Sequence, residues 1–215
     1  MRPVTQFMKS LALLISLGWM VPTGTVVTFD SGSVGRPPAG WTVATTNGGP
    51  PAEWRILQDS TAPTQPYVLA QTSTGPSGRC PLAILNSVFL RDGDVSVRIK
   101  PVSGKEDQAG GVVWRYRDSG NYYLARVNSL TRNVVVFKVR NGVRTRVSLA
   151  VPHDIPINAW SILKVSARGD RFQVFIDHRR ILQGYDRTFA TAGKVGLWTA
   201  ADSVTYFDDF RVYPK

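Results

Sequence analysis

Short runs of alternating apolar and polar residues follow one another about every ten residues from residue 25 to the end of the chain. Clusters of Gly, Asn, Asp, Ser and Pro separate these runs, and after residue 24 none has the length and period of an amphipathic helix. Roughly twelve short strands with no change of composition between them are typical of an antiparallel β-sandwich. The chain has 215 residues, which suits one large β-domain better than two. We therefore predict an all-β fold with a single domain over residues 25–215.

The segment Ala109–Asn128 is the clearest hairpin, with two alternating runs joined by a short turn. Alternation places Arg115 on one face of the first strand, and Tyr122, Arg126 and Asn128 together on one face of the second. The two arginines share a face only if the register pairs them. Guanidinium, phenol and amide groups suit a hydroxyl-rich ligand, so we predict that these four residues bind one from an open face. The alternative is an ordinary hairpin with snorkelling arginines.

Trp198 follows the turn at Gly193 and is the candidate platform on which the C–H face of a sugar ring would stack. Its alternation with Val195 and Leu197 is equally compatible with a place in the core. Both interpretations stay open at this stage. With Arg115, Tyr122, Arg126 and Asn128, it completes the predicted ligand site.

The chain carries a net charge of +11, and nineteen of its 26 basic residues are arginine. Arginine pairs bidentately with carboxylate, phosphate or sulfate groups. An anionic partner such as an acidic envelope polysaccharide is therefore expected. The arginines are spread along the chain and form no run, which argues against a nucleic-acid partner.

Residues 1–24 have the features of a secretory signal. Arg2 and Lys9 form a basic start, and Leu11–Val21 forms an apolar core that is shorter than a membrane span requires. No motif identifies the cleavage site, and an uncleaved N-terminal anchor is the alternative. Cys80 is the only cysteine, so no internal disulfide indicates the compartment. We predict export to the periplasm or the extracellular space, with no membrane span in the mature chain.

Five strings of the sequence together resemble one bacterial group: FDSGSVGRPPAGW, DVSVRIKPVSG, DQAGGVVWRYRDSGNYYLARVN, RGDRFQVFID and GKVGLWTAADSVTYFDDFRV. The chain resembles the concanavalin A-like lectin/glucanase superfamily, laminin G-like in architecture. Within it, the chain is similar to the secreted bacterial domains grouped with the 3-keto-disaccharide hydrolase family. The resemblance covers nearly all of the chain after the signal and implies a jelly-roll sandwich. It does not choose a function, because the superfamily holds lectins, glycosidases, lyases and adhesion modules.

An ordinary glycosidase needs two carboxyl groups beside the bond that it cleaves. Related glucanases place them on one strand as E-x-D-x-x-E, a motif that is absent from this sequence. The only glutamates, Glu53 and Glu106, lie far apart, and the adjacent Asp208 and Asp209 point to opposite faces of a strand. Cleavage of a 3-keto-sugar stays open, because oxidation at C3 acidifies the neighbouring C–H, and His153 with a nearby aspartate is the candidate base.

Proteins similar to this one often hold a calcium ion where the last strand lies near the first. The resemblance therefore implies a structural calcium to which Asp209 contributes its carboxylate. The alternative is that Asp208 or Asp209 accepts hydrogen bonds from backbone amides or from an arginine at a bulge. No other cofactor is expected.

These observations favour an exported, carbohydrate-associated β-sandwich that binds a glycan or an envelope polysaccharide. A 3-keto-glycoside hydrolase or lyase is the first alternative. A structural adhesion module without a sugar site is the second.

Overall fold

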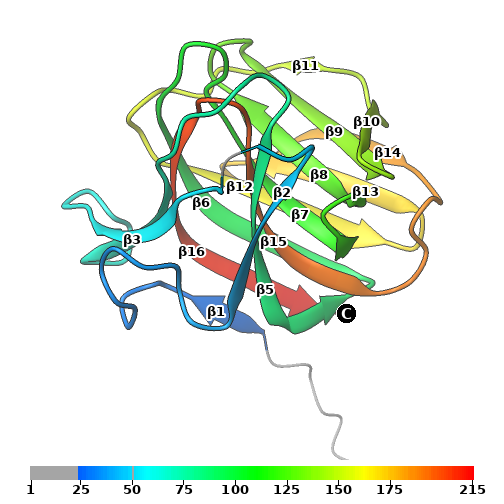
Figure 1. Cartoon of the computed structure of the whole chain (residues 1–215). Helices are drawn as coiled ribbons and strands as arrows, with labels where there is room; N and C mark the ends of the chain where they lie inside the picture. Colours follow the sequence, from blue (N-terminus) through cyan, green and yellow to red (C-terminus); the bar gives the residue numbers. More distant parts are fainter. Residues whose placement is uncertain (1–23, 50) are drawn as a thin grey trace, which may run out of the picture.

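The computed structural model describes residues 24–49 and 51–215, and these residues form sixteen β-strands and no α-helix. The strands lie in two antiparallel sheets that pack face to face (Figure 1). The predicted all-β antiparallel sandwich is therefore confirmed. The predicted export segment lies outside the described residues except for Gly24. Among the described residues, no helix is long and apolar enough to cross a membrane.

The first sheet, called sheet I below, has eight strands, and its long strand β16 pairs with β6, β4 and β1. Because β1 pairs with the end of β16, the first and last strands lie side by side (Figure 1). Across the sheet the order is β14 (Arg179–Tyr185), β13 (Arg171–Ile176), β12 (Ser161–Arg168), β6 (Gly93–Ser103), β16 (Val204–Pro214), β4 (Tyr67–Gln71) and β3 (Trp54–Gln58), with β1 (Thr25–Val27) beside β16.

The second sheet, sheet II, contains the predicted central hairpin as β7 and β8. Some strands of both sheets are too short to show an alternating pattern, and so the count exceeds the roughly twelve expected. Across sheet II the order is β10 (Val143–Arg146), β9 (Asn133–Arg140), β8 (Asn121–Asn128), β7 (Ala109–Asp118), β15 (Gly193–Thr199), β5 (Cys80–Leu90) and β2 (Trp41–Thr46), with β11 (Val151–Pro152) beside β9.

The main core lies between the two sheets and follows directly from alternation along the strands. In β12, Leu163, Val165 and Ala167 are buried, while the residues between them are half-buried and face outward. From sheet II, Trp114 meets them and stacks on Tyr123, with ring centroids 5.2 Å apart. The hairpin contributes Val112, Trp114, Tyr123, Ala125 and Val127 to the main core.

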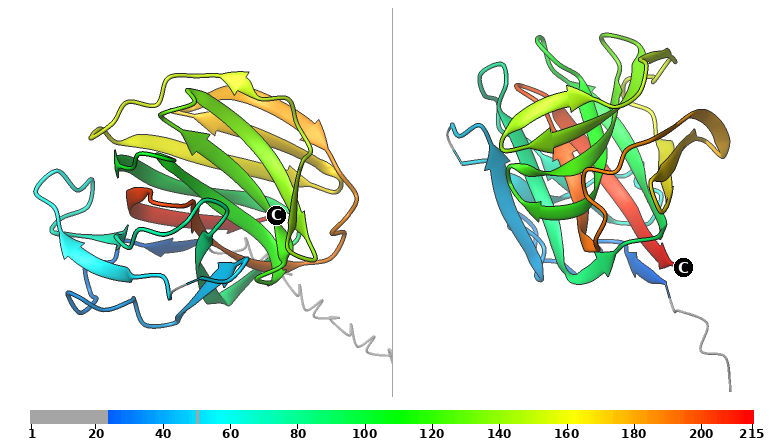
Figure 2. Two further views of the ribbon diagram at one scale, coloured as in Figure 1. Left: turned by 45° about the horizontal axis from the view of Figure 1, so that its top comes forward. Right: turned by 90° about the vertical axis from the view of Figure 1, so that its right-hand side faces the viewer.

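Sheet II is strongly curled, and its outer face encloses a second core. Thr46 Oγ1 of β2 lies 2.8 Å from the Tyr122 hydroxyl of β8, although three strands separate β2 from β8. Arg144 of β10 likewise reaches Cys80 of β5, with Nη1 3.9 Å from Sγ. In a flat sheet β10 and β5 would lie roughly 24 Å apart. The views in Figure 2 also show the sheets as curved layers. The enclosed second core contains Cys80, Leu82, Ile84, Ala109, Val113, Tyr122, Leu124, Val135, Phe137, Val139, Trp198 and Ala200.

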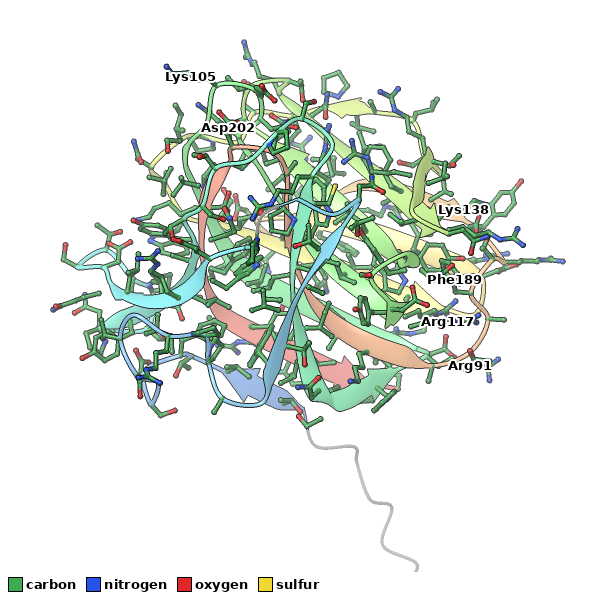
Figure 3. All side chains as sticks on the ribbon, viewed as in Figure 1. Arg91, Lys105, Arg117, Lys138, Phe189 and Asp202 are labelled. Carbon is green, nitrogen blue, oxygen red and sulfur yellow. The ribbon has the colours of Figure 1, made fainter. Side chains whose placement is uncertain are left out.

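The connection from β14 to β15, residues 186–192, crosses from sheet I to sheet II and is held by one polar cluster. Asp186 accepts hydrogen bonds from the Tyr123 hydroxyl at 2.6 Å and from Lys138 Nζ at 2.8 Å. The N–H of Phe189 donates to the same tyrosine oxygen at 3.1 Å. Lys138 and Phe189 lie close to each other along this edge of the molecule (Figure 3). The cluster therefore fixes this connection to sheet II.

Protonation of Asp186 in acid should disrupt this cluster and lower the free energy of unfolding. Burial by itself would raise the pKa of Asp186, but hydrogen bonds from Lys138, Thr188 and Tyr123 outweigh it and lower the pKa to about 2. A depressed pKa contributes stability above the ordinary value of 3.8, and this contribution disappears as pH falls from there towards 2. We expect Asp186→Asn to lower the free energy of unfolding at neutral pH by on the order of 2 kcal/mol and to remove this part of the acid dependence.

Urea unfolding at neutral pH and at several acidic pH values measures both effects. Asp154→Asn is the matched control, because Asp154 is exposed and pairs only with Arg132, and it should leave the stability nearly unchanged. Equal acid sensitivity in the wild type and in Asp186→Asn would contradict the assignment.

Candidate functional site

Arg115 does not lie on an open face, because the strand is interrupted there. Its φ is 49°, and the pairing of β7 with β8 shifts register between Trp114 and Asp118. A bulge of this kind turns the side chain away from the face that alternation predicts. The side chain is only 2% exposed. The prediction that Arg115 binds a ligand from an open face is therefore wrong.

The buried guanidinium of Arg115 instead joins three loops. Nε and Nη2 donate to the carbonyl of Arg91 at 3.0 and 2.9 Å, and Nη1 donates to the carbonyl of Phe189 at 2.8 Å. Nη2 also donates to the carbonyl of Gly169 at 2.6 Å and lies 3.4 Å from Asp92 Oδ1. Burial lowers the pKa of Arg115, which Tyr123 and Asp92 partly offset. Arg115 is therefore a structural cation between the sheets.

Tyr122, Asn128 and Trp198 are also fully buried, so the expectation that they lie on an open face is wrong as well. Tyr122 and Trp198 belong to the second core, which the curl of sheet II closes. For Trp198, the core interpretation is the one that the structure supports. Asn128 Oδ1 accepts the N–H groups of Leu130 and Thr131 at 2.9 and 3.1 Å, and so it stabilises the turn after β8.

Arg126 lies opposite Gly111 of β7, so the register does not bring it beside Arg115. Its guanidinium is half-buried, donates to Asn133 Oδ1 and lies 5.5 Å from the ring centroid of Phe137. Burial lowers the pKa of Arg126 to about 10. The five residues predicted as one ligand site therefore do not form a common open surface.

Asp208 and Asp209 form hydrogen bonds with protein groups. Asp208 accepts from the N–H and hydroxyl of Thr64, each at 2.7 Å, and from the N–H of Asp209 at 2.6 Å. Asp209 accepts from Arg211 Nε and Nη2 at 2.7 and 2.9 Å, with Arg98 Nε at 3.5 Å. The two guanidinium groups occupy and neutralise the carboxylate of Asp209. These residues do not fit a calcium ion, which needs about six to eight oxygen ligands that are free to coordinate it, because both carboxylates are already engaged by protein donors.

The histidines lie apart from each other and from any set of carboxylates. His153 lines a shallow hollow with Arg132 and Asp154, and Arg132 holds both carboxylate oxygens of Asp154. Because Arg132 occupies both carboxylate oxygens of Asp154, this aspartate is not free to orient the base predicted at His153. Among the described residues, no group of three or more His, Cys, Asp and Glu side chains could hold a metal ion.

An open pocket of about 700 Å³ lies at one edge of sheet I, over β12, β13 and β14. Register aligns its residues in two rows across the three strands. One row is Ser166, Gln173 and Gln183, and the second is Arg168, Arg171 and Tyr185. Neighbours within a row are about 5 Å apart at Cβ. The pocket is therefore lined by side chains whose spacing is set by the sheet.

Two aspartates orient the charged groups of the pocket. Asp94 accepts from Ser166 Oγ at 2.8 Å and from Arg168 Nη2 at 2.9 Å. Burial would raise the pKa of Asp94, but these two hydrogen bonds help to keep it below its usual value. Asp170 at the rim accepts from Arg187 Nε at 3.0 Å. Arg171 is the register partner of Arg168 and follows Asp170 in the chain, and its side chain has no ion-pair or hydrogen-bond partner among the described residues.

The inner wall of the pocket depends on Gly184. A Cβ at this position would lie 2.6 Å from the Phe172 ring, too close for any other residue without a shift of the ring. Glycine therefore lets β14 lie against Phe172, which belongs to the main core. Beside it, the ring of Tyr185 is 75% exposed. The pocket thus combines a rigid wall with an accessible aromatic ring.

Arg115 also supports this pocket. The turn between β12 and β13 contains Gly169, whose carbonyl accepts from Arg115 and whose N–H donates to Asp92 Oδ1 at 2.6 Å. The next residue, Asp170, holds Arg187 and accepts the N–H of Asp186 at its carbonyl, at 2.8 Å. The predicted ligand residue Arg115 is therefore a positioning residue for a different site.

Sequence reasoning did not identify this pocket. Gly169 and Asp170 form the turn of the hairpin between β12 and β13. The sequence carries polar residues at every second position of the three strands, in the strings S-A-R, R-F-Q and Q-G-Y. Such a pattern is also that of any solvent-facing strand, so it does not single out a site.

Comparisons with known proteins show which folds the chain resembles. No family model matches the chain. The chain is 31% identical to a levanase of Bacillus subtilis (strain 168) over 117 residues, 53% of its own length, and it spans 16% of that relative. A carbohydrate-binding module of Bacillus subtilis, CBM66, is 25% identical with a TM-score of 0.62, over 80% of this chain and 94% of that one.

Two further structures share the fold at lower identity. The β-glucanase of Bacillus licheniformis has a TM-score of 0.60 at 15% identity, covering 89% of this chain and 98% of that one. A Bacillus subtilis protein described as galectin-like in fold has a TM-score of 0.58 at 12% identity, with 80% and 88% covered. These structures are jelly-roll sandwiches, which confirms the predicted fold class. Membership of the 3-keto-disaccharide hydrolase family stays a prediction.

Removal of calcium should not affect this domain. We expect EDTA to leave Tm unchanged, because Arg98 and Arg211 already neutralise Asp209. A bound ion would add roughly 2.7 kcal/mol at a hundredfold excess over its Kd. Thermal melts with EDTA and with added calcium test this. A fall in Tm that calcium restores would show that the site exists after all.

Replacement of Arg115 should destabilise the protein strongly. Arg115→Met keeps most of the volume but leaves the carbonyls of Arg91, Gly169 and Phe189 without their donor. We expect a loss of roughly 3 kcal/mol in the free energy of unfolding. Urea unfolding measures it, with Arg171→Ala as the control that should change stability by less than about 0.5 kcal/mol. Similar stability of the two variants would mean that Arg115 is not structural.

Proposed function

We propose that this domain binds a carbohydrate in the pocket over β12, β13 and β14, and that it does not cleave it. The observation that carries the proposal is the exposed ring of Tyr185 beside a row of amide and hydroxyl groups on a rigid sheet. A sugar presents both hydroxyl groups and a C–H face. Such a ligand is recognised by a few well-placed polar groups together with an apolar surface.

The polar row offers complementary partners. Gln173 and Gln183 lie opposite each other on neighbouring strands, and each amide both donates and accepts hydrogen bonds. Adjacent hydroxyl groups of a sugar have the same dual character. The sheet sets the backbone positions of both residues, so the two amides extend from neighbouring points on the same face. A short stretch of a polysaccharide fits such a shallow, open pocket.

The pocket is poorly suited to glycoside hydrolysis. Both ordinary mechanisms need two carboxyl groups flanking one bond. Asp170 is the only carboxylate among the described residues that line the pocket, and it is paired with Arg187. The likeness to CBM66 supports binding, since that structure is described as a carbohydrate-binding module. The relative named levanase makes levan the first polysaccharide to test.

The other predicted functions have less support. A 3-keto-glycoside hydrolase or lyase requires a base with an electrophile, and His153 lies outside the pocket beside a paired Asp154. An adhesion module without a sugar site would give the pocket no role. We further propose that the domain meets its polysaccharide outside the cytoplasm, as the export segment predicted over residues 1–24 suggests.

Two variants of the pocket should lose affinity without loss of stability. We expect Tyr185→Ala and Gln183→Ala each to weaken binding of levan, or of another polysaccharide that the wild type binds, by about tenfold. Affinity electrophoresis followed by calorimetry measures this, and an assay for newly formed reducing ends should show no cleavage.

Tyr213→Ala is the matched control, because Tyr213 is also an exposed tyrosine of sheet I but lies outside the pocket lining. It should bind as the wild type does. Full binding by both pocket variants would place the site elsewhere. Absence of binding to a broad panel of polysaccharides would refute the proposed function.

A further inference from the structure

The pocket contains two like charges in direct opposition. Arg168 at the end of β12 and Arg171 at the start of β13 are register partners across the hairpin. Like charges directly opposite each other on neighbouring strands are destabilising. Asp94 offsets the charge of Arg168, with Oδ1 2.9 Å from Nη2. The charge of Arg171 is therefore the one that an anionic ligand would balance.

The acidic residues of the pocket do not balance Arg171. Asp94 is shared by Arg168 and Lys164, whose Nζ lies 3.7 Å from Oδ2. Asp170 pairs with Arg187. Among the residues that the structure describes, Arg171 has no counterion. A guanidinium group in this position can form two parallel hydrogen bonds with a carboxylate or sulfate group.

From this geometry we infer that the pocket takes an acidic saccharide, whose carboxylate or sulfate group pairs with Arg171 while its ring packs on Tyr185. The inference rests on the proposed function and names the ligand class for the same pocket. Arg171 and Tyr185 are register partners across β13 and β14, so one sugar unit reaches both. Gln173 and Gln183 then lie one step along the strands for the hydroxyl groups of that unit or of its neighbour.

A nucleic acid would also bring anionic groups, but the pocket suits it less well. Tight binding to a phosphate backbone uses many cations along a track. Here only Arg171 is left without a counterion, and neutral amides surround it. The pocket is therefore suited to a ligand that carries one anionic group among many hydroxyl groups.

The test compares ligands that differ only in charge. Polygalacturonate and its methyl ester form one pair, and chondroitin sulfate and unsulfated chondroitin form the second. Neutral levan and a single-stranded oligonucleotide complete the set. We expect the wild type to bind at least one acidic member about tenfold more tightly than its neutral counterpart at low salt, with the preference falling as salt increases. The member that is preferred distinguishes carboxylate from sulfate.

Arg171→Gln should abolish this preference while keeping Tm and any binding of the neutral member. Arg179→Gln removes the same charge from an exposed position of β14 outside the pocket lining and should keep the preference. Equal binding of acidic and neutral members by the wild type would overturn the inference but leave the proposed function intact. Absence of binding to every polysaccharide would overturn both, and tighter binding of the oligonucleotide would replace the acidic saccharide with a nucleic acid.

Discussion

The buried guanidinium of Arg115 is the interaction on which this end of the sandwich depends. It comes from sheet II and donates to carbonyls in the β5–β6 turn, in the β12–β13 turn of sheet I and in the β14–β15 connection. Each carbonyl lies where the chain leaves a sheet and has no ladder partner. One cation thus serves three acceptors, of which the carbonyl of Phe189 belongs to a buried residue, and hydrogen bonds to a charged group are stronger than those between neutral groups.

The fold itself was predictable because its causes are local. Alternation along β6 buries Val95, Val97 and Ile99 in the main core, and the turn residues of the hairpins set where most strands end. The bulge at Arg115 was not predictable, because a positive φ at an arginine leaves no mark in a polar and apolar pattern. The irregular pairing between Trp114 and Asp118 then moved a side chain from the predicted open face into the interior.

The predicted ligand residues failed for a second reason, which is the curl of sheet II. Tyr122 lies on the outer face as alternation indicated, and so does Trp198, for which alternation left both places open, yet that face is enclosed as a second core. Curvature arises from how distant strands meet, as in the contact between Thr46 and Tyr122, and no single strand encodes it. Aromatic and amide side chains on an outer face are therefore compatible both with a binding surface and with a buried one. Only the contact between β2 and β8 distinguishes the two.

The pocket of sheet I has the opposite character, since ordinary surface residues become a site through their support. Asp94 and Asp170 hold Arg168 and Arg187, and the turn that carries Asp170 is itself held by Arg115. These contacts restrict the rotamers that the side chains would otherwise sample, so less entropy is lost when a ligand binds. Among the described residues that line the pocket, they leave Arg171 as the cation without an acidic partner. The same ion pairs that make the rim rigid therefore determine which charge is available to a ligand.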